Sequence, residues 1–181
     1  MYLNMLHTLS ISENAQKTQD MLQRIVKLVN YRHFRRDEVV TVTEELDHVH
    51  LLVGIFKQRF GNKLDFLMVS EGSLEEGYLP HYSILAFIEN ALYHGLEPKE
   101  GEWRLELYLN ASADCLSINI IDNGVGFDVE NTLYGSTAGQ NDFSSINWVL
   151  EKLHSHFKGM GNVKISSQLS KGTKIQITLP A

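Results

Sequence analysis

The stretch SINIIDNGVGF, residues 117–127, carries the pattern that decides the fold. Its apolar positions indicate a buried strand, and Asp122-Asn123-Gly124-Val125-Gly126 follows that strand directly. A carboxylate at a strand end can accept a hydrogen bond from an exocyclic amine. Two glycines one residue apart let the backbone turn and approach a ligand closely. The alternative is an ordinary Asp-Asn-Gly hairpin turn. No apolar strand follows at once, which disfavours a tight hairpin, but these residues alone leave both interpretations open.

Two helices are predicted upstream of this segment. Residues 13–36 contain no Gly or Pro and carry a wide apolar stripe at helical spacing. Thr41 followed by Glu44 is typical of a capping box, which opens a second helix. That helix has one apolar seam at steps of three and four, and Gly61 ends it.

The other elements predict a layered α+β domain. A hairpin links each of two strand pairs, and the helices stay on one side, which favours a two-layer α/β sandwich over a doubly wound sheet. In chain order we expect a strand at 64–68, a loop at 71–78, a helix opened by Pro80 and ended by Gly95 and Pro98, strands at 103–109 and 116–120, a long loop at 122–142, a helix at 146–153, and a final hairpin of 163–167 and 175–179.

Composition excludes several classes of protein. A formal charge of −6 argues against nonspecific nucleic-acid binding, which relies on Lys and Arg, so we expect no nucleic-acid partner. The single cysteine, Cys115, cannot form an internal disulfide and fits a reducing compartment. No apolar run approaches the ~18 residues of a membrane-spanning helix, and no secretory signal is visible. The sequence therefore predicts a soluble, cytoplasmic domain.

The helix that Pro80 is expected to open carries three polar residues of interest. Asn90 and His94 are four apart and share a helix face, and Glu89 lies about 100° round, where it could border the same cleft. Carboxylate and amide oxygens suit Mg²⁺, which usually takes one or two protein ligands beside water and phosphate. The alternative is that Glu89 and Asn90 are solvated and His94 caps the helix.

Other polar residues carry little weight alone. Gly172-Thr173 sits at a predicted hairpin turn, where its role is structural when taken by itself. The close histidine pairs, His48 with His50 and His154 with His156, point in different directions on a helix, which argues against zinc. Cys115 lies in an apolar strand pattern and is a poor candidate for a nucleophile.

In combination, the motifs resemble a known fold. Glu-Asn on a helix, Asp-x-Gly-x-Gly after a strand and Gly-Thr in the last hairpin occur in the order of the GHKL (Bergerat) ATP-binding fold. Within that group the chain is most similar to the LytS-type sensor histidine kinases. Residues 85–95 resemble their N box, residues 122–126 their first glycine box, residues 172–175 their closing segment, and Glu44-Glu45-Leu46 with Arg59-Phe60 their linker helix.

The resemblance implies ATP and Mg²⁺ as cofactors and gives each matching residue a role. Asn90 would ligate Mg²⁺, and Glu89 would polarise the attacking group or a water. Asp122 would accept a hydrogen bond from the adenine amino group, assisted by Thr173. His94 would lie near the phosphates. Gly124 and Gly126 would let the loop pack against the base.

The sequence departs from this family pattern in two places. The family's phosphoacceptor histidine would fall just before Met1, since residues 1–6 align with the segment after it, and His7 has the wrong spacing to replace it. We therefore expect a fragment of a longer protein, or else a short protein without the acceptor. The family's Gly-x-Gly-Leu lid is replaced by Phe143-Ser144-Ser145-Ile146, which disfavours tight ATP binding and fast turnover.

The expected organisation is a helical segment at 1–61, part of a dimerisation and phosphoacceptor region, followed by a GHKL catalytic domain at 62–181. The expected function is that of a histidine kinase that phosphorylates a histidine upstream, works with a response regulator, forms a homodimer through its N-terminal helices, and belongs to a parent that membrane helices can anchor. The alternative is a degenerate module that dimerises and regulates a partner. A third interpretation, a GHKL chaperone or topoisomerase part, is disfavoured by the N-terminal helices and the short length.

Overall fold

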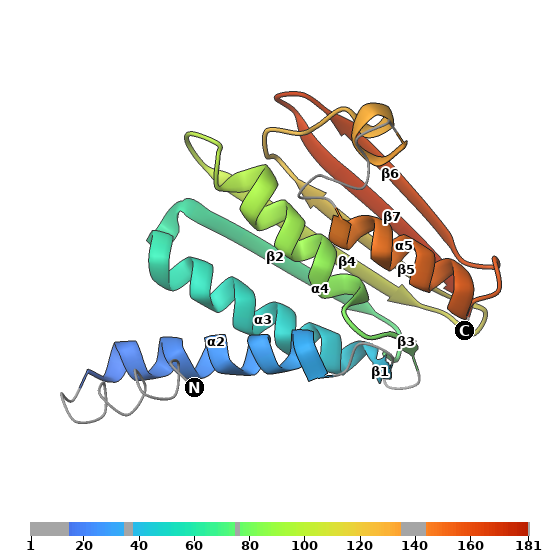
Figure 1. The fold of residues 1–181 in the computed structure, drawn as a ribbon, viewed down its shortest axis with the longest axis horizontal. Coiled ribbons are helices and arrows are strands. Elements are labelled where there is room, and N and C mark those ends of the chain that lie inside the picture. Colours follow the sequence, from blue (N-terminus) through green and yellow to red (C-terminus); the bar gives the residue numbers. More distant parts are fainter. Residues whose placement is uncertain (1–14, 35–37, 75–76, 135–143, 181) are drawn as a thin grey trace.

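The computed structural model describes residues 15–34, 38–74, 77–134 and 144–180. Within them the expected order of elements is confirmed: two helices precede an α+β unit (Figure 1). The elements are α2 (Gln16–Phe34), β1 (Val39–Thr41), α3 (Val42–Phe60), β2 (Leu64–Glu71), β3 (Tyr78–Pro80), α4 (Ser83–Asn90), η2 (Ala91–Leu96), β4 (Trp103–Ala111), β5 (Cys115–Asp122), η3 (Glu130–Tyr134), α5 (Ser144–His156), β6 (Asn162–Gln168) and β7 (Gly172–Pro180), with a 3₁₀ turn η1 (Gly61–Lys63).

The main sheet has five strands in the order β2-β4-β5-β7-β6. β2 pairs with β4 in parallel, through the crossover that contains α4, and the other three pairings are antiparallel. β5 and β7 therefore lie inside the sheet, although β7 is the last strand of the chain. In their register Asp122 lies opposite Thr173, which brings two of the predicted site residues together.

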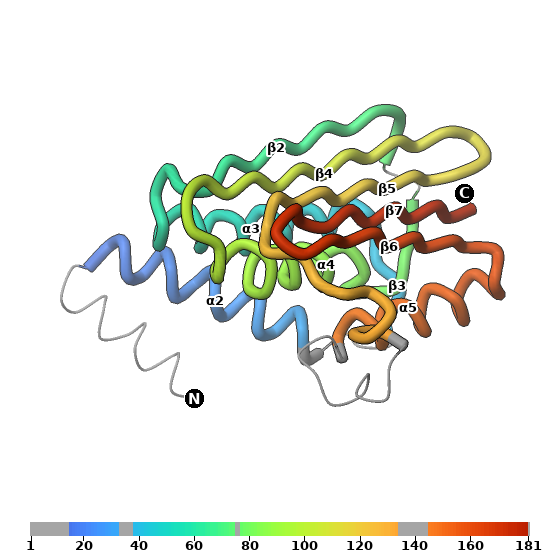
Figure 2. The backbone as a smooth tube through the Cα atoms, turned by 90° about the horizontal axis from the view of Figure 1, so that it is seen from above, coloured from blue at the N-terminus to red at the C-terminus, as the bar shows by residue number. Residues whose placement is uncertain are grey.

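The helices cover one face of the sheet, and Figure 2 shows the two layers from above. α3, α4 and α5 form the helical layer, while α2 packs outside, against α3. Alternate residues of β4 and β5 are buried beneath these helices, as expected for a sheet with one covered face. The same core contains α3 residues such as Val49 and Phe56. None of the described helices is long and apolar enough to cross a membrane.

Several predicted boundaries were wrong. Pro80 does not open a helix: it ends β3, which pairs antiparallel with β1, a strand that the sequence did not predict. α4 begins at Ser83, where a buried carboxylate supplies the helix cap. The loop expected at 71–78 is narrower, since β2 runs to Glu71. A π-helical turn, η3, lies in the predicted loop after Asp122. Thr41 does cap α3, because its hydroxyl accepts from the Glu44 N–H at 3.1 Å.

Candidate functional site

Asp122 lies at the inner end of the site, at the last position of β5. It is 6% exposed, and one carboxylate oxygen accepts from the Gly124 N–H at 2.8 Å. Thr173, on β7, also hydrogen-bonds it through its backbone and its side chain. Burial raises the pKa of Asp122 to about 6, and the hydrogen bonds from Gly124 and Thr173 oppose that rise. These hydrogen bonds fix the orientation of the Asp122 carboxylate. Because the side chain is buried, water has little access to its oxygens.

Gly124 brings the end of β5 into contact with the end of the N-box helix, which consists of α4 and η2. A Cβ at this position would lie 2.4 Å from the carbonyl oxygen of Gly95 and 2.7 Å from a carboxylate oxygen of Asp122. The neighbouring Val125 N–H donates to the Gly95 carbonyl at 2.8 Å. The close approach at Gly124 therefore serves contact between two protein segments, and it places the end of η2 beside Asp122.

The loop beyond Gly124 is tied to the final hairpin. Gly126 has φ +63°, and a Cβ there would lie 2.1 Å from the carbonyl oxygen of Gln168. The Ser167 hydroxyl accepts from the Phe127 N–H at 2.9 Å and lies 3.0 Å from the Thr173 hydroxyl. Ser167 thus connects the glycine loop to the partner of Asp122. Sequence reasoning missed Ser167, and no motif in the sequence marks it.

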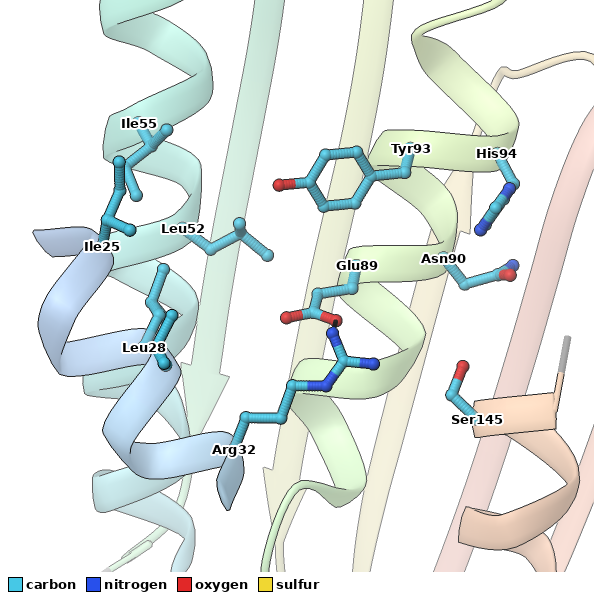
Figure 3. Close-up of a pocket in the computed structure, with 11 residues that line it drawn as sticks. Ile25, Leu28, Arg32, Leu52, Ile55, Glu89, Asn90, Tyr93, His94 and Ser145 are labelled. Atoms are coloured by element: carbon cyan, nitrogen blue, oxygen red, sulfur yellow. Dashed lines mark ion pairs between the residues drawn. The ribbon is translucent and has the colours of Figure 1, made fainter. Parts of the chain in front are cut away.

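The predicted residues of the N box line one cavity of about 420 Å³ (Figure 3). Glu89, Asn90 and His94 all border it, as does Ser145 from the first turn of α5. Asn90 points toward the α5 side, and Glu89 points toward α2 and α3. The remaining wall is mostly apolar. It comes from α2 (Ile25, Leu28, Val29 and Arg32), from α3 (Leu52 and Ile55), and from Tyr93 on η2.

Asn90 fits the role of a metal ligand. It is 7% exposed, and its Oδ1 has no hydrogen-bond partner among the residues that the structure describes. A buried amide oxygen without a partner is costly, so it favours a ligand that can satisfy it. The described part of the chain holds no group of three or more His, Cys, Asp or Glu side chains suited to a metal ion. An ion held by one protein oxygen, with water and phosphate, matches the habits of Mg²⁺.

Glu89 is engaged from two sides. The Tyr82 hydroxyl donates to its Oε2, and the Arg32 guanidinium lies 3.7 Å from the same oxygen. Burial raises the pKa of Glu89, while the Tyr82 hydrogen bond and the Arg32 charge oppose the rise. Neither partner was predicted from the sequence.

A second carboxylate, Glu45 on α3, sets where α4 begins. It is fully buried and accepts from the N–H groups of Ile84 at 2.9 Å and Leu85 at 3.0 Å, from the Tyr82 N–H and from the Tyr31 hydroxyl. Burial raises its pKa, and these donors counter that effect. A negative group at a helix N-terminus also interacts favourably with the helix dipole. Glu45 thus ties α2, α3 and α4 together.

Comparisons with known proteins find sensor histidine kinases among the similar chains. A family profile described as Histidine kinase matches residues 2–64. The sensor histidine kinase YesM of Bacillus subtilis is 28% identical over 153 residues, which cover 84% of this chain. The sensor protein LytS of Staphylococcus epidermidis is 20% identical and covers 99% of it. Over most of its length the chain is similar to LytS-type sensor histidine kinases.

Solved histidine kinases share the fold. The catalytic domain of the histidine kinase ThkA matches with a TM-score of 0.54 at 11% identity, over 79% of this chain and 94% of that one. The kinase domain of a blue-light activated histidine kinase from Erythrobacter litoralis matches with a TM-score of 0.54 at 13% identity, over 94% of this chain and 74% of that one. The predicted α+β fold of GHKL type is thereby confirmed. The chain spans 26% of the length of YesM and 31% of LytS.

Three predicted features lie wholly or partly outside the described residues. These are the segment at 1–6 that would follow an acceptor histidine, His7, and Phe143 of the altered lid. Of the lid, Ser144 to Ile146 belong to the first turn of α5.

Proposed function

We propose that this chain binds ATP with Mg²⁺ and transfers the γ-phosphoryl group to a histidine of the same sensor kinase. The observation that carries this proposal is the pairing of Asp122 with Thr173 across β5 and β7, beside a helix whose Asn90 presents an unpartnered Oδ1. The first pair offers acceptors for an adenine amine. The Asn90 Oδ1 offers a ligand for the metal that accompanies the phosphates.

Each predicted residue keeps its proposed role. Asp122 accepts from the exocyclic amine, and Thr173 orients its carboxylate. Asn90 holds Mg²⁺, which would neutralise phosphate charge when bound. His94, one helical turn from Asn90, lies where it can contact phosphate oxygens. Gly124 and Gly126 keep the loop close enough to frame the base.

In the proposed transfer a histidine ring nitrogen forms a bond to the γ-phosphorus. The bond from phosphorus to the β–γ bridging oxygen breaks, and ADP leaves with that electron pair. Glu89 accepts a hydrogen bond from the other ring N–H, which stabilises the positive charge that develops on the imidazole. Most of the catalysis is positioning and charge neutralisation, as is usual for phosphoryl transfer.

We propose a functional boundary near residue 61. Residues 1–61 contribute to dimerisation and bring the acceptor histidine to the site, and residues 62–181 bind the nucleotide. A response regulator would then take the phosphoryl group. The reaction belongs on the cytoplasmic side, where ATP is present, in a parent protein that can be anchored in a membrane.

Isothermal titration with a nonhydrolysable ATP analogue and Mg²⁺ tests the nucleotide site. We expect saturable binding, and Asp122→Asn should weaken it by about 1–3 kcal/mol, the cost of a mismatched buried hydrogen bond. Glu106→Gln on the neighbouring strand β4 is the matched control, because it removes one half-buried carboxylate elsewhere on the sheet. An absence of binding at millimolar nucleotide would overturn the proposal.

The second candidate is a degenerate module that dimerises and regulates a partner. The serines at 144 and 145, in place of lid glycines, favour it, because a glycine-rich lid wraps phosphates with backbone N–H groups. Phosphotransfer in a protein extended upstream to include the histidine separates the two. Label on that histidine would exclude the module.

A further inference from the structure

Two consecutive residues of α2 contact two carboxylates that lie near the two ends of α4. The Tyr31 hydroxyl donates to Glu45, whose carboxylate caps the N-terminus of α4. The Arg32 guanidinium pairs with Glu89, near the other end of that helix. Because Tyr31 and Arg32 are adjacent on one helix, the buried Tyr31 contact fixes where the Arg32 side chain begins. Arg32 therefore reaches Glu89 from an anchored position, although its own side chain is 51% exposed.

Tyr82 completes the contact with Glu89. Its backbone is left-handed, at φ 69° and ψ 19°, a conformation that costs energy for a bulky residue, and its N–H bonds the Glu45 carboxylate. Its hydroxyl donates to the same Glu89 oxygen that faces Arg32, and the guanidinium lies 5.5 Å from the centroid of the Tyr82 ring. The orientation of Glu89 is thus set by groups on α2 and at the α4 cap.

Glu89 and Asn90 are neighbours in sequence, but their side chains point to different sides of the cavity. Figure 3 shows Glu89 directed toward α2 and α3, with the dashed ion pair to Arg32, while Asn90 points to the other side, toward Ser145. Asn90 therefore faces the part of the cavity that we assign to metal and phosphate. The Glu89 carboxylate faces the helical segment that would bring the acceptor histidine.

We propose that Arg32 is a positioning residue that, together with Tyr82, holds the Glu89 carboxylate toward the N-terminal helices, in the orientation that receives the acceptor histidine. This inference rests on the proposed function. Because the Arg32 side chain is half exposed and lies 3.7 Å from the Glu89 oxygen, the ion pair contributes little to folding. Its effect should therefore appear in the rotamer of Glu89 and in the transfer rate, rather than in stability or nucleotide affinity.

The first measurement needs neither nucleotide nor activity. Three-bond carbon couplings report the χ1 and χ2 rotamers of Glu89 in the free chain. We expect one rotamer in the unaltered chain and in Arg32→Lys, and rotamer averaging in Arg32→Gln. Lys27→Gln is the matched control, since it removes one exposed charge from the same helix. A single unchanged Glu89 rotamer in Arg32→Gln would overturn the inference, whatever the kinase activity.

The second measurement uses a protein that carries the acceptor histidine. Arg32→Gln should lower the phosphotransfer rate roughly tenfold, the scale of a misplaced catalytic group, with nucleotide affinity unchanged. Arg32→Lys should recover most of the rate. In a Glu89→Gln background the Arg32→Gln effect should vanish. A rate that rises, stays constant or falls equally in both backgrounds contradicts the inference. Transfer that is absent from the unaltered protein contradicts the proposed function instead, and the rotamer measurement still decides the role of Arg32.

Discussion

Gly124 lies against the backbone of Gly95 so closely that a Cβ at position 124 would fall 2.4 Å from the Gly95 carbonyl oxygen. The contact joins the loop after β5 to the end of the N-box helix, which are distant in sequence. It fixes the distance between the two halves of the proposed site, the half that we propose for base recognition and the half that we propose for metal and phosphate.

Gly124→Ala should therefore damage the site by steric overlap. The two nearest obstructing atoms belong to the Gly95 backbone, so they cannot move aside as a flexible side chain would. The third is the Asp122 carboxylate oxygen that the Gly124 N–H holds in place. Overpacking of this kind costs about 1–3 kcal/mol. We expect at least a tenfold loss of nucleotide affinity in calorimetry, together with a lower denaturation midpoint. Gly61→Ala is the control: its φ of +62° is strained for alanine, but no atom lies within 4 Å of the added Cβ. Nucleotide affinity lost equally in both variants would show that the contact with Gly95 has no special role.

Nucleotide binding should depend on the ionisation of Asp122. Its pKa of about 6 means that the carboxylate gains a proton between pH 7.5 and 5.5, and a neutral carboxyl accepts less strongly from an amine. If only the ionised form binds, affinity should fall about fourfold over that range. Asp122→Asn, titrated with the same ligand, should bind weakly and lack this component, which separates it from ionisation of the phosphates. Identical pH profiles in the two proteins would contradict the assignment.

The same shift has a defined effect on folding. The pKa is raised in the folded state, so the unfolded chain releases the Asp122 proton at lower pH. The stabilising contribution of this group is therefore present below about pH 4 and is lost as pH rises through 6. Urea denaturation of the unaltered chain and Asp122→Asn at pH 4.5 and 7.5 measures it. We expect the variant to gain stability relative to the unaltered chain at the higher pH.

The buried Glu45 should matter for stability more than any surface charge. Glu45→Gln places an amide N–H₂ against backbone N–H donors, and disruption of a buried charged network typically costs about 3–5 kcal/mol. Tyr31→Phe removes a single donor and should cost about 1–2 kcal/mol. Chemical denaturation measures both. Tyr78→Phe, on a tyrosine that is 58% exposed, should change the free energy of unfolding by less than ~0.5 kcal/mol. A Tyr31→Phe effect no larger than this control would rule out the contact with Glu45 as a stabilising link.

Ser167 should support Thr173 and the glycine loop. Ser167→Ala removes the acceptor for the Phe127 N–H and a hydroxyl neighbour of Thr173, at a cost of about 1 kcal/mol. We expect a severalfold weaker nucleotide affinity by calorimetry and faster amide exchange at Phe127. Ser166→Ala, on the adjacent exposed position of β6, should leave both unchanged. Unaltered exchange at Phe127 in Ser167→Ala would show that the hydroxyl does not hold the loop.

Much of the fold could be predicted from the sequence, because the spacing of apolar residues indicates which face of a helix or strand is buried. The alternation in β4 and β5 and the seam of α3 both report burial against one core. The predicted start of α4 failed for a physical reason. A proline at a first helical turn is a local signal, but the cap comes from Glu45, nearly forty residues upstream. A hint was present, since Glu45 occurs at the spacing of the buried face of α3.

For the candidate site, the sequence predicted the residues that form motifs and missed those that act through space. Asp122 and Thr173 were expected to cooperate, and strand pairing places them opposite each other. Arg32 and Ser167 belong to no pattern of spacing, because their roles depend on how α2 and β6 pack. The glycines illustrate a related limit: the sequence indicated a close approach, but only the structure shows that Gly124 meets Gly95 and Gly126 meets Gln168.

The position of β7 has a consequence for synthesis. This last strand enters the sheet between β5 and β6, and it supplies Thr173. Until it leaves the ribosome, β5 and β6 each expose an unpaired edge, and Asp122 has no partner from the opposite strand. Before β7 pairs with them, the exposed edges of β5 and β6 can pair with strands of other chains. The partly synthesised chain is therefore prone to aggregate at this stage.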